Sequence, residues 1–210
     1  RLKRSYTKEH MDKRILKKYA QLLVKYSLNV QPKERVLVRT TALAAPLVEE
    51  IQREILLAGA YPEYQISVQN QEKIFLETAN EDQLKTPPYL YEHAVKEFDA
   101  MISIMAPYDI KATADVPGEI KTKRQKALSQ LKEVFMKRSA DKELKWTLCV
   151  YPTESSAAEC GMTVEEYTEF VTQACMLSLE NPRKGWQELS VFQESLVTQL
   201  NQCHAFLLVL

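Results

Sequence analysis

The chain has 210 residues, 45% of them hydrophobic and 27% charged, which is enough to bury one substantial core. Its 28 basic residues balance its 28 acidic residues, so the overall charge indicates neither a nucleic-acid partner nor a membrane partner. The first residues contain no signal-peptide core, and the apolar run at 205–210 is too short to span a bilayer. We therefore expect a cytoplasmic protein.

Helical and strand patterns alternate from the first residues to the last. A stripe of apolar residues from Ile15 to Tyr26 predicts a first helix, which Pro32 ends. Pro46 suits the first turn of a second helix, and Gly59 supplies the left-handed residue that stops it. Helices are predicted over residues 15–26, 46–58, 72–79, 88–98, 117–138, 164–179 and 182–202.

The strand segments are rich in β-branched and aliphatic residues. The segment AMISIM at 100–105 is almost continuously apolar, as expected of a strand that is covered on both faces. Strands are predicted at residues 35–41, 64–68, 100–105, 146–151 and 205–210. The buried centre of their sheet is predicted to consist of Val36, Leu37, Val38, Ile102, Ile104 and Leu148. The last helix is predicted to turn Leu189, Phe192, Leu196 and Leu200 inward.

Strands that alternate with helices form parallel β-α-β units with right-handed crossovers. The sequence therefore predicts a three-layer α/β fold with a mainly parallel sheet of about five strands. Residues 1–210 show no linker, low-complexity tract or internal repeat, so we expect a single α/β domain. Leu210 closes an apolar strand with no polar tail, and we expect the polypeptide of the parent protein to continue beyond it.

Cysteine and glycine usage excludes several kinds of site. The four cysteines, at positions 149, 160, 175 and 203, form no C-x-x-C pair, which favours reduced thiols over a zinc knuckle or a disulfide framework. The four glycines cannot build a phosphate-binding loop of either common type. Ser155 and Ser156 have no flanking glycine, so there is no nucleophile elbow.

The remaining candidates for chemistry are isolated in the sequence. His93 has no second histidine at i+4, as a zinc helix would need, and is interpreted as a surface residue. Cys160 would be a nucleophile only if the fold brought a distant histidine to it. Asp109 and Asp115 follow the third strand, where parallel sheets bind ligands, but both suit helix capping.

Glu165, Glu166 and Glu169 are the remaining carboxylate cluster. Adjacent helical residues point about 100° apart, so Glu165 and Glu166 do not converge easily on one ion. Thr163 and Glu166 instead form a T-x-x-E capping box at a helix start, where acidic residues are favourable. From the residues, we assign no catalytic, cofactor-binding or metal-binding position in this chain.

Four segments stand out by their order and spacing. They are YAxLL with LNVQP at 19–32, PLV with RE and AGA at 46–60, W with YPT, GMT and EY at 146–167, and W with Q and LN at 186–201. Together they resemble the thermophilic aminopeptidase family, the metallopeptidases of the aminopeptidase T and aminopeptidase S type. The resemblance covers nearly the whole chain from about Met11, and one departure is Lys33, where the family usually has glycine.

This resemblance implies the N-terminal domain, with flavodoxin-like topology, of a two-domain homodimeric enzyme. In the family, glutamates, histidines, a tyrosine and an aspartate of the second domain hold two divalent ions, expected to be Zn, Co, Mg or Mn. None of these ligands has a counterpart here, so this chain alone is expected to bind no catalytic metal and to be inactive. The complete enzyme would remove N-terminal amino acids from peptides, and this part would wall the substrate cavity and support dimerisation.

Two other functions fit the same sequence. A related scaffold occurs in iron-dependent, ring-cleaving dioxygenases, which would differ in the ligands of the second domain. A stand-alone binding or assembly module is the alternative from another class. No nucleic-acid or membrane partner is expected in any of the three cases.

Overall fold

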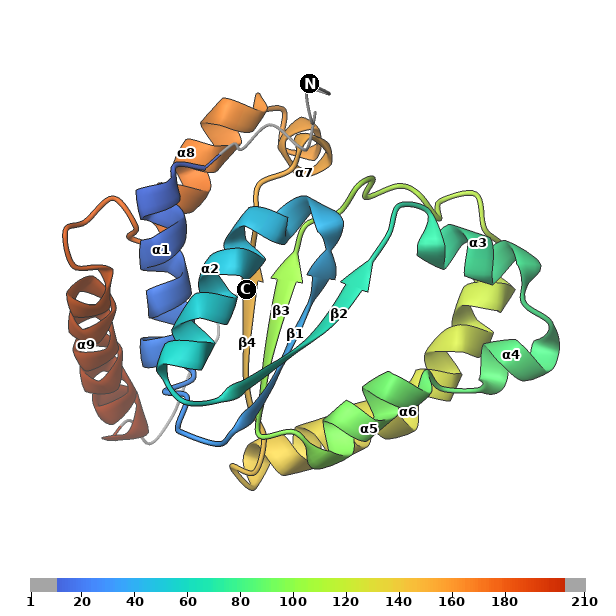
Figure 1. The fold of residues 1–210 in the computed structure, drawn as a ribbon, viewed down its shortest axis with the longest axis horizontal. Coiled ribbons are helices and arrows are strands. Elements are labelled where there is room, and N and C mark those ends of the chain that lie inside the picture. Colours follow the sequence, from blue (N-terminus) through green and yellow to red (C-terminus); the bar gives the residue numbers. More distant parts are fainter. Residues whose placement is uncertain (1–10, 203–210) are drawn as a thin grey trace.

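The computed structural model describes residues 11–202, which fold around a sheet of four parallel strands (Figure 1). These are β1 (Arg35–Thr41), β2 (Tyr61–Ser67), β3 (Ala100–Met105) and β4 (Lys145–Val150). Their order is β2-β1-β3-β4, which is the order of the first four strands in flavodoxin-like folds. The α/β prediction is confirmed with four strands in this part of the chain. The fifth predicted strand, 205–210, lies outside the described residues.

One face of the sheet is covered by α1 (Lys13–Gln21) and α2 (Ala45–Leu57), with α8 (Val164–Ala174) and α9 (Pro182–Gln202) farther out on the same side (Figure 1). The chain of α1 continues as a short π-helix, Leu22–Ser27. Both ends of α2 are as predicted, because Pro46 lies in its first turn and Gly59 follows it with a φ of 74°. Another short helix, α7 (Glu154–Glu159), follows β4.

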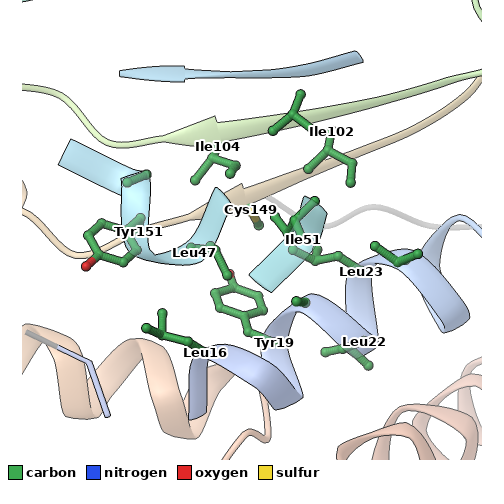
Figure 2. Close-up of a cluster of buried hydrophobic side chains, with 14 of the residues drawn as sticks. Leu16, Tyr19, Leu22, Leu23, Leu47, Ile51, Ile102, Ile104, Cys149 and Tyr151 are labelled. Carbon is green, nitrogen blue, oxygen red and sulfur yellow. The ribbon is translucent and has the colours of Figure 1, made fainter. Parts of the chain in front are cut away.

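The main hydrophobic core lies between this face and α1 and α2 (Figure 2). Tyr19 projects from α1, and Leu47 and Ile51 from α2, toward Ile102 of β3. These four residues are at most 2% exposed. Five of the six residues predicted at the centre of the sheet are buried as expected: Val36, Leu37, Val38, Ile102 and Ile104.

The other face of the sheet is covered unevenly. α5 (Tyr89–Glu97) and α6 (Gly118–Ala140) bury Leu37 and Met101 near the amino ends of the strands. α3 (Gln71–Thr78) and α4 (Glu81–Lys85) pack instead near the start of α6, through a separate cluster that contains Leu76, Leu84 and Val116. Within the described part of the chain, no helix packs directly on the carboxyl half of this face, and the site described below lies there.

The prediction that Leu148 lies in the core is wrong. Leu148 is 55% exposed and Trp146 is 51% exposed, on the same side of β4. Successive side chains of a strand point to opposite faces, and on the other face of β4 Cys149 is buried while Lys145 and Thr147 are partly exposed. β4 is an edge strand among the described residues, so its apolar pattern does not mark burial on both faces.

The inward face predicted for the last helix is also wrong. In α9, Phe192 is 58% exposed, Leu196 is 41% exposed and Leu200 is 51% exposed. The helix is fastened near its start, where the Trp186 Nε1–H donates to the Cys175 carbonyl oxygen at 3.1 Å. Beyond that turn its apolar stripe meets no described element that buries it. Within residues 11–202, no helix is long and apolar enough to cross a membrane.

Polar contacts join the amino ends of the strands. The Asp99 carboxylate accepts the Arg35 N–H at 2.7 Å, and the Asp99 carbonyl accepts the Lys145 N–H at 2.9 Å. The Lys145 ammonium lies 2.6 Å from the Glu34 carboxylate. Arg138 of α6 donates to carbonyl oxygens at the end of α5. Strands and helices are therefore held together at this end of the sheet.

Lys33, which replaces the glycine of the family pattern, has a φ of 71°. A side chain in this left-handed conformation costs about 1 kcal/mol relative to glycine. The turn is kept by the Lys33 N–H, which donates to the Gly59 carbonyl at 2.8 Å. Lys33 therefore occupies a backbone conformation that favours glycine, and this hydrogen bond helps to hold it there.

Candidate functional site

A cleft of about 1140 Å³ lies at the carboxyl ends of the strands. The chain runs from β1 to β2 on one side and returns to β3 on the other, so the strand order reverses between β1 and β3. Open α/β sheets bind ligands in the crevice at such a reversal. The cleft lies at this point and continues under α3, α5 and α6, with the loop after β3 and α7 on its opposite wall.

Two hydroxyl groups tie β1 to β3 at the floor of the cleft. The Thr40 hydroxyl donates to the Ile104 carbonyl at 3.0 Å, and the Thr41 hydroxyl donates to the Ala106 carbonyl. Both threonines line the cleft. These bonds fix the crevice where the two strands would otherwise separate.

Arg39 of β1 projects into the cleft from the sheet. Its guanidinium carbon lies 3.9 Å from the centre of the Tyr91 ring, and its Nε–H donates to Gln65 Oε1 at 2.8 Å. Stacking on Tyr91 and the bond to Gln65 therefore hold the guanidinium in one orientation. Among residues 11–202, no carboxylate forms an ion pair with it.

Arg124 of α6 lies across the cleft and has a different role. It stacks on Phe75 at 4.5 Å, and it donates to the carbonyl oxygens of Leu84 and Thr86, the latter at 2.7 Å. Its guanidinium thus closes the carboxyl end of α4, where helix carbonyls lack intrahelical partners. Arg124 shapes the wall of the cleft.

Sequence reasoning missed both arginines. The segment RVLVRTT places Leu37, Arg39 and Thr41 on one face of β1, opposite Val36 and Val38. A change from leucine to arginine and threonine along one face signals that burial ends partway along the strand. That signal was present, but it could be recognised only once β1 was known to be central.

The two predicted aspartates are not brought together. Asp109 lines the cleft, where its carboxylate accepts the Lys111 N–H at 2.8 Å in a turn. Asp115 lies 2.8 Å from the Lys73 ammonium, and its hydrogen bond to that group lowers the pKa of Asp115. Both side chains are engaged in local or inter-helix contacts, but neither caps a helix, so the capping prediction is wrong: α6 begins after Pro117 without a side-chain cap.

The glutamates at the start of α8 form the predicted capping box. The Glu166 carboxylate accepts the Thr163 N–H at 2.8 Å, and this bond lowers the pKa of Glu166. Glu169 accepts a hydrogen bond from Gln173 at 2.7 Å. His93 is exposed and contacts the Phe98 ring edge-on.

These donors do not fit a metal ion. Within the described part of the chain, no group of three or more His, Cys, Asp or Glu side chains is placed to hold one. A tightly held divalent ion needs several such ligands around one point. No step of a metal-dependent reaction can therefore be assigned to the residues described here.

The described cysteines differ in environment and are all free thiols. Cys149 is buried, and burial raises its pKa to about 12. Burial also raises the pKa of Cys175, which is partly exposed. Cys160 is exposed and lines the cleft, but no histidine within residues 11–202 hydrogen-bonds to it. Cys203 lies outside the described residues.

These environments predict selective alkylation. At about pH 8, iodoacetamide should modify Cys160 at least about a hundredfold faster than Cys149. The thiolate is the reacting form, and burial both keeps Cys149 protonated and shields it from the reagent. Peptide mass mapping over time measures both rates. In concentrated guanidinium chloride the two rates should converge, and equal rates in the folded protein would contradict the placement of Cys149.

The chain is similar to two known proteins, each of which is about twice its length. The chain is 27% identical over 198 residues to "Aminopeptidase 2" of Geobacillus stearothermophilus, covering 89% of this chain and 48% of that protein. A solved structure described as wild-type AmpT from Thermus thermophilus matches with a TM-score of 0.64 at 23% identity, covering 77% of this chain and 42% of that one. The chain thus spans about half the length of these relatives.

The family assignment rests on a match along almost the whole chain. The family model described as "Thermophilic metalloprotease (M29)" matches residues 12–208. The resemblance of the four sequence segments is thereby confirmed, and so is the α/β fold. The chain belongs to the thermophilic metalloprotease (M29) family.

Proposed function

We propose that this chain is the N-terminal domain of a metal-dependent aminopeptidase that removes N-terminal amino acids from peptides. Its role is to wall the substrate cavity and to support a homodimer. The two divalent ions are held by a second domain outside residues 1–210. The protein acts in the cytoplasm.

The partial alignment with an aminopeptidase carries this proposal, and the donor set of the described residues supports it. The chain aligns along most of its length with an aminopeptidase, but covers 48% of it, and its described residues contain no metal-ligand cluster. A metallopeptidase needs its ions to generate hydroxide near neutral pH and to stabilise the oxyanion that develops. The division between a scaffold in this chain and ligands elsewhere accounts for both facts.

The cleft supports the role of a cavity wall. It lies at the carboxyl ends of parallel strands and is lined by both apolar and hydrogen-bonding side chains, as small-molecule sites are. Its chemistry suits contact with part of a peptide. It does not suit cleavage, since neither Cys160 nor any described serine is paired with a histidine.

The proposal is tested with two proteins from the same gene, the 210-residue chain and a polypeptide extended to the full length of the relative. Both are assayed on leucyl- and arginyl-coumarin substrates with cobalt, zinc, magnesium or manganese added in turn. We expect metal-dependent turnover from the longer protein and the uncatalysed rate from the 210-residue chain. Metal analysis after dialysis should find bound ions in the longer protein.

The outcomes separate the alternatives. Ring cleavage of a catechol by the iron-loaded longer protein, without peptidase activity, would favour the dioxygenase. A stop codon directly after Leu210 would favour a binding module. Turnover by the 210-residue chain itself, surviving chromatography, would contradict the division of labour between the two domains.

A further inference from the structure

Arg39 is held in the cleft with hydrogen-bonding capacity to spare. Its Nε–H is used by Gln65, and its planar face is used by Tyr91. The terminal nitrogens carry four further N–H donors, and no carboxylate or carbonyl among residues 11–202 accepts from them. Arg124, on the opposite wall, uses its Nη1 donors on two backbone carbonyls. The two arginines therefore differ in what they leave available.

The Arg39 guanidinium is half-buried, yet no anion among the described residues compensates its charge. Removing a charge from water costs free energy unless a partner compensates it. The stacking on Tyr91 and the bond to Gln65 fix the group before any ligand arrives, which lowers the entropy cost of binding. A guanidinium fixed in this way presents a fork of parallel donors, the geometry that matches a carboxylate or a phosphate.

The sheet register gives the surroundings of this fork. Arg39 pairs with Gln65 on β2 and with Ser103 on β3, so these three side chains form one row on the same face. Two residues farther along the strands, Thr41 and Met105 lie on that face. The row places a hydroxyl beside the cation and leads toward an apolar region.

The apolar region is exposed in the cleft. Met105 is 53% exposed and Ile110 is 48% exposed, and both line it together with Val150. Exposed apolar side chains next to a fixed cation suit a ligand that carries an anionic group close to an apolar one. A free phosphate would use the cation and leave the apolar wall in water.

We propose that this cleft binds the terminal carboxylate of a short peptide, with Arg39 as the anion-binding residue and Met105 and Ile110 in contact with an apolar side chain beside that carboxylate. The choice of a peptide rests on the proposed function. An aminopeptidase holds the free amine of its substrate at the metal ions, so the carboxylate is the end left for the domain formed by this chain to recognise. The fork of Arg39 would then favour short peptides over long ones.

The test compares a peptide acid with its amide. Tri-leucine and tri-leucine amide are titrated into the 210-residue chain and followed by calorimetry and by NMR shifts of the cleft residues. We expect the acid to bind about tenfold to a hundredfold more tightly than the amide, as for a hydrogen-bonded ion pair. Arg39→Gln should remove this difference. The matched control is Arg183→Gln, an exposed arginine on α9 that should leave it unchanged.

Further measurements test the peptide assignment and the role of the guanidinium. Equal binding of acid and amide by the unmodified chain overturns the proposal, even if Arg39→Gln fails to fold. Arg39→Lys keeps the charge without the fork, and we expect it to recover part of the preference. Competition by inorganic phosphate at lower concentrations than tri-leucine would overturn the peptide assignment.

The site and the proposed function can fail separately. If the longer protein shows no peptidase activity but the acid preference still depends on Arg39, the site stands and the proposed function falls. If the longer protein cleaves tri-leucine and its amide with equal KM, and Arg39→Gln changes neither value, the function stands and the site falls.

Discussion

Replacing Ile102 with alanine is expected to lower the free energy of unfolding by about 3–5 kcal/mol. Ile102 is 0% exposed and lies on β3, which is paired on both sides by β1 and β4. The cost combines the lost transfer free energy of the removed carbon atoms with that of the cavity they leave. A strand bonded on both sides cannot easily move to fill that cavity.

The matched control for this change is Leu148→Ala on the neighbouring edge strand. Leu148 is 55% exposed, so its truncation should cost less than about 1 kcal/mol. Denaturant unfolding followed by circular dichroism measures both variants against the parent chain. Similar losses for the two variants would show that β4 is buried on both faces, as the sequence pattern suggested.

Replacing Tyr19 with alanine is expected to cost about 3–5 kcal/mol, since it empties a large buried site. Tyr19 is 2% exposed, and burial raises the pKa of its phenol well above the usual value. The neutral hydroxyl donates to the Val150 carbonyl at 3.1 Å and accepts the Val150 N–H at 3.3 Å. The Cys175 thiol lies 3.6 Å from the same oxygen.

Tyr19→Phe separates the ring from the hydroxyl. It keeps the packing and leaves the two backbone groups of Val150 without this partner, which should cost about 1–3 kcal/mol. Thermal and denaturant unfolding give both losses. If Tyr19→Phe were as stable as the parent chain, water or another group would have to satisfy Val150, and the bridge from α1 to β4 would carry no net stability.

The sequence predicts correctly those elements whose structure depends on residues close to one another in the chain. β1 and β3 occur at the predicted residues. β3 in particular shows the almost unbroken apolar run that is typical of a buried parallel strand. The capping box at Thr163 and the stop at Gly59 depend on contacts within a few residues. Short-range chemistry of this kind does not require knowledge of the neighbours in space.

The wrong predictions concern residues whose burial depends on segments that are distant in the sequence. Leu148 and Phe192 belong to apolar patterns like those of the core, yet both are more than half exposed. A periodicity shows which residues share a face, and the packing of distant segments determines whether that face is covered. Arg39 was missed for the same reason, since its environment is built by Tyr91 and Gln65 from two other elements.

The bonded amino ends of the strands have a mechanical consequence. Asp99, Lys145 and Arg138 fasten the strands and the α5–α6 pair at one end, and the cleft opens at the other. The sheet and the α5–α6 pair are therefore joined at the end of the domain opposite the cleft. The Arg39 guanidinium also stacks on Tyr91 of α5, so any widening of the cleft by movement of this layer away from the sheet would have to break that contact.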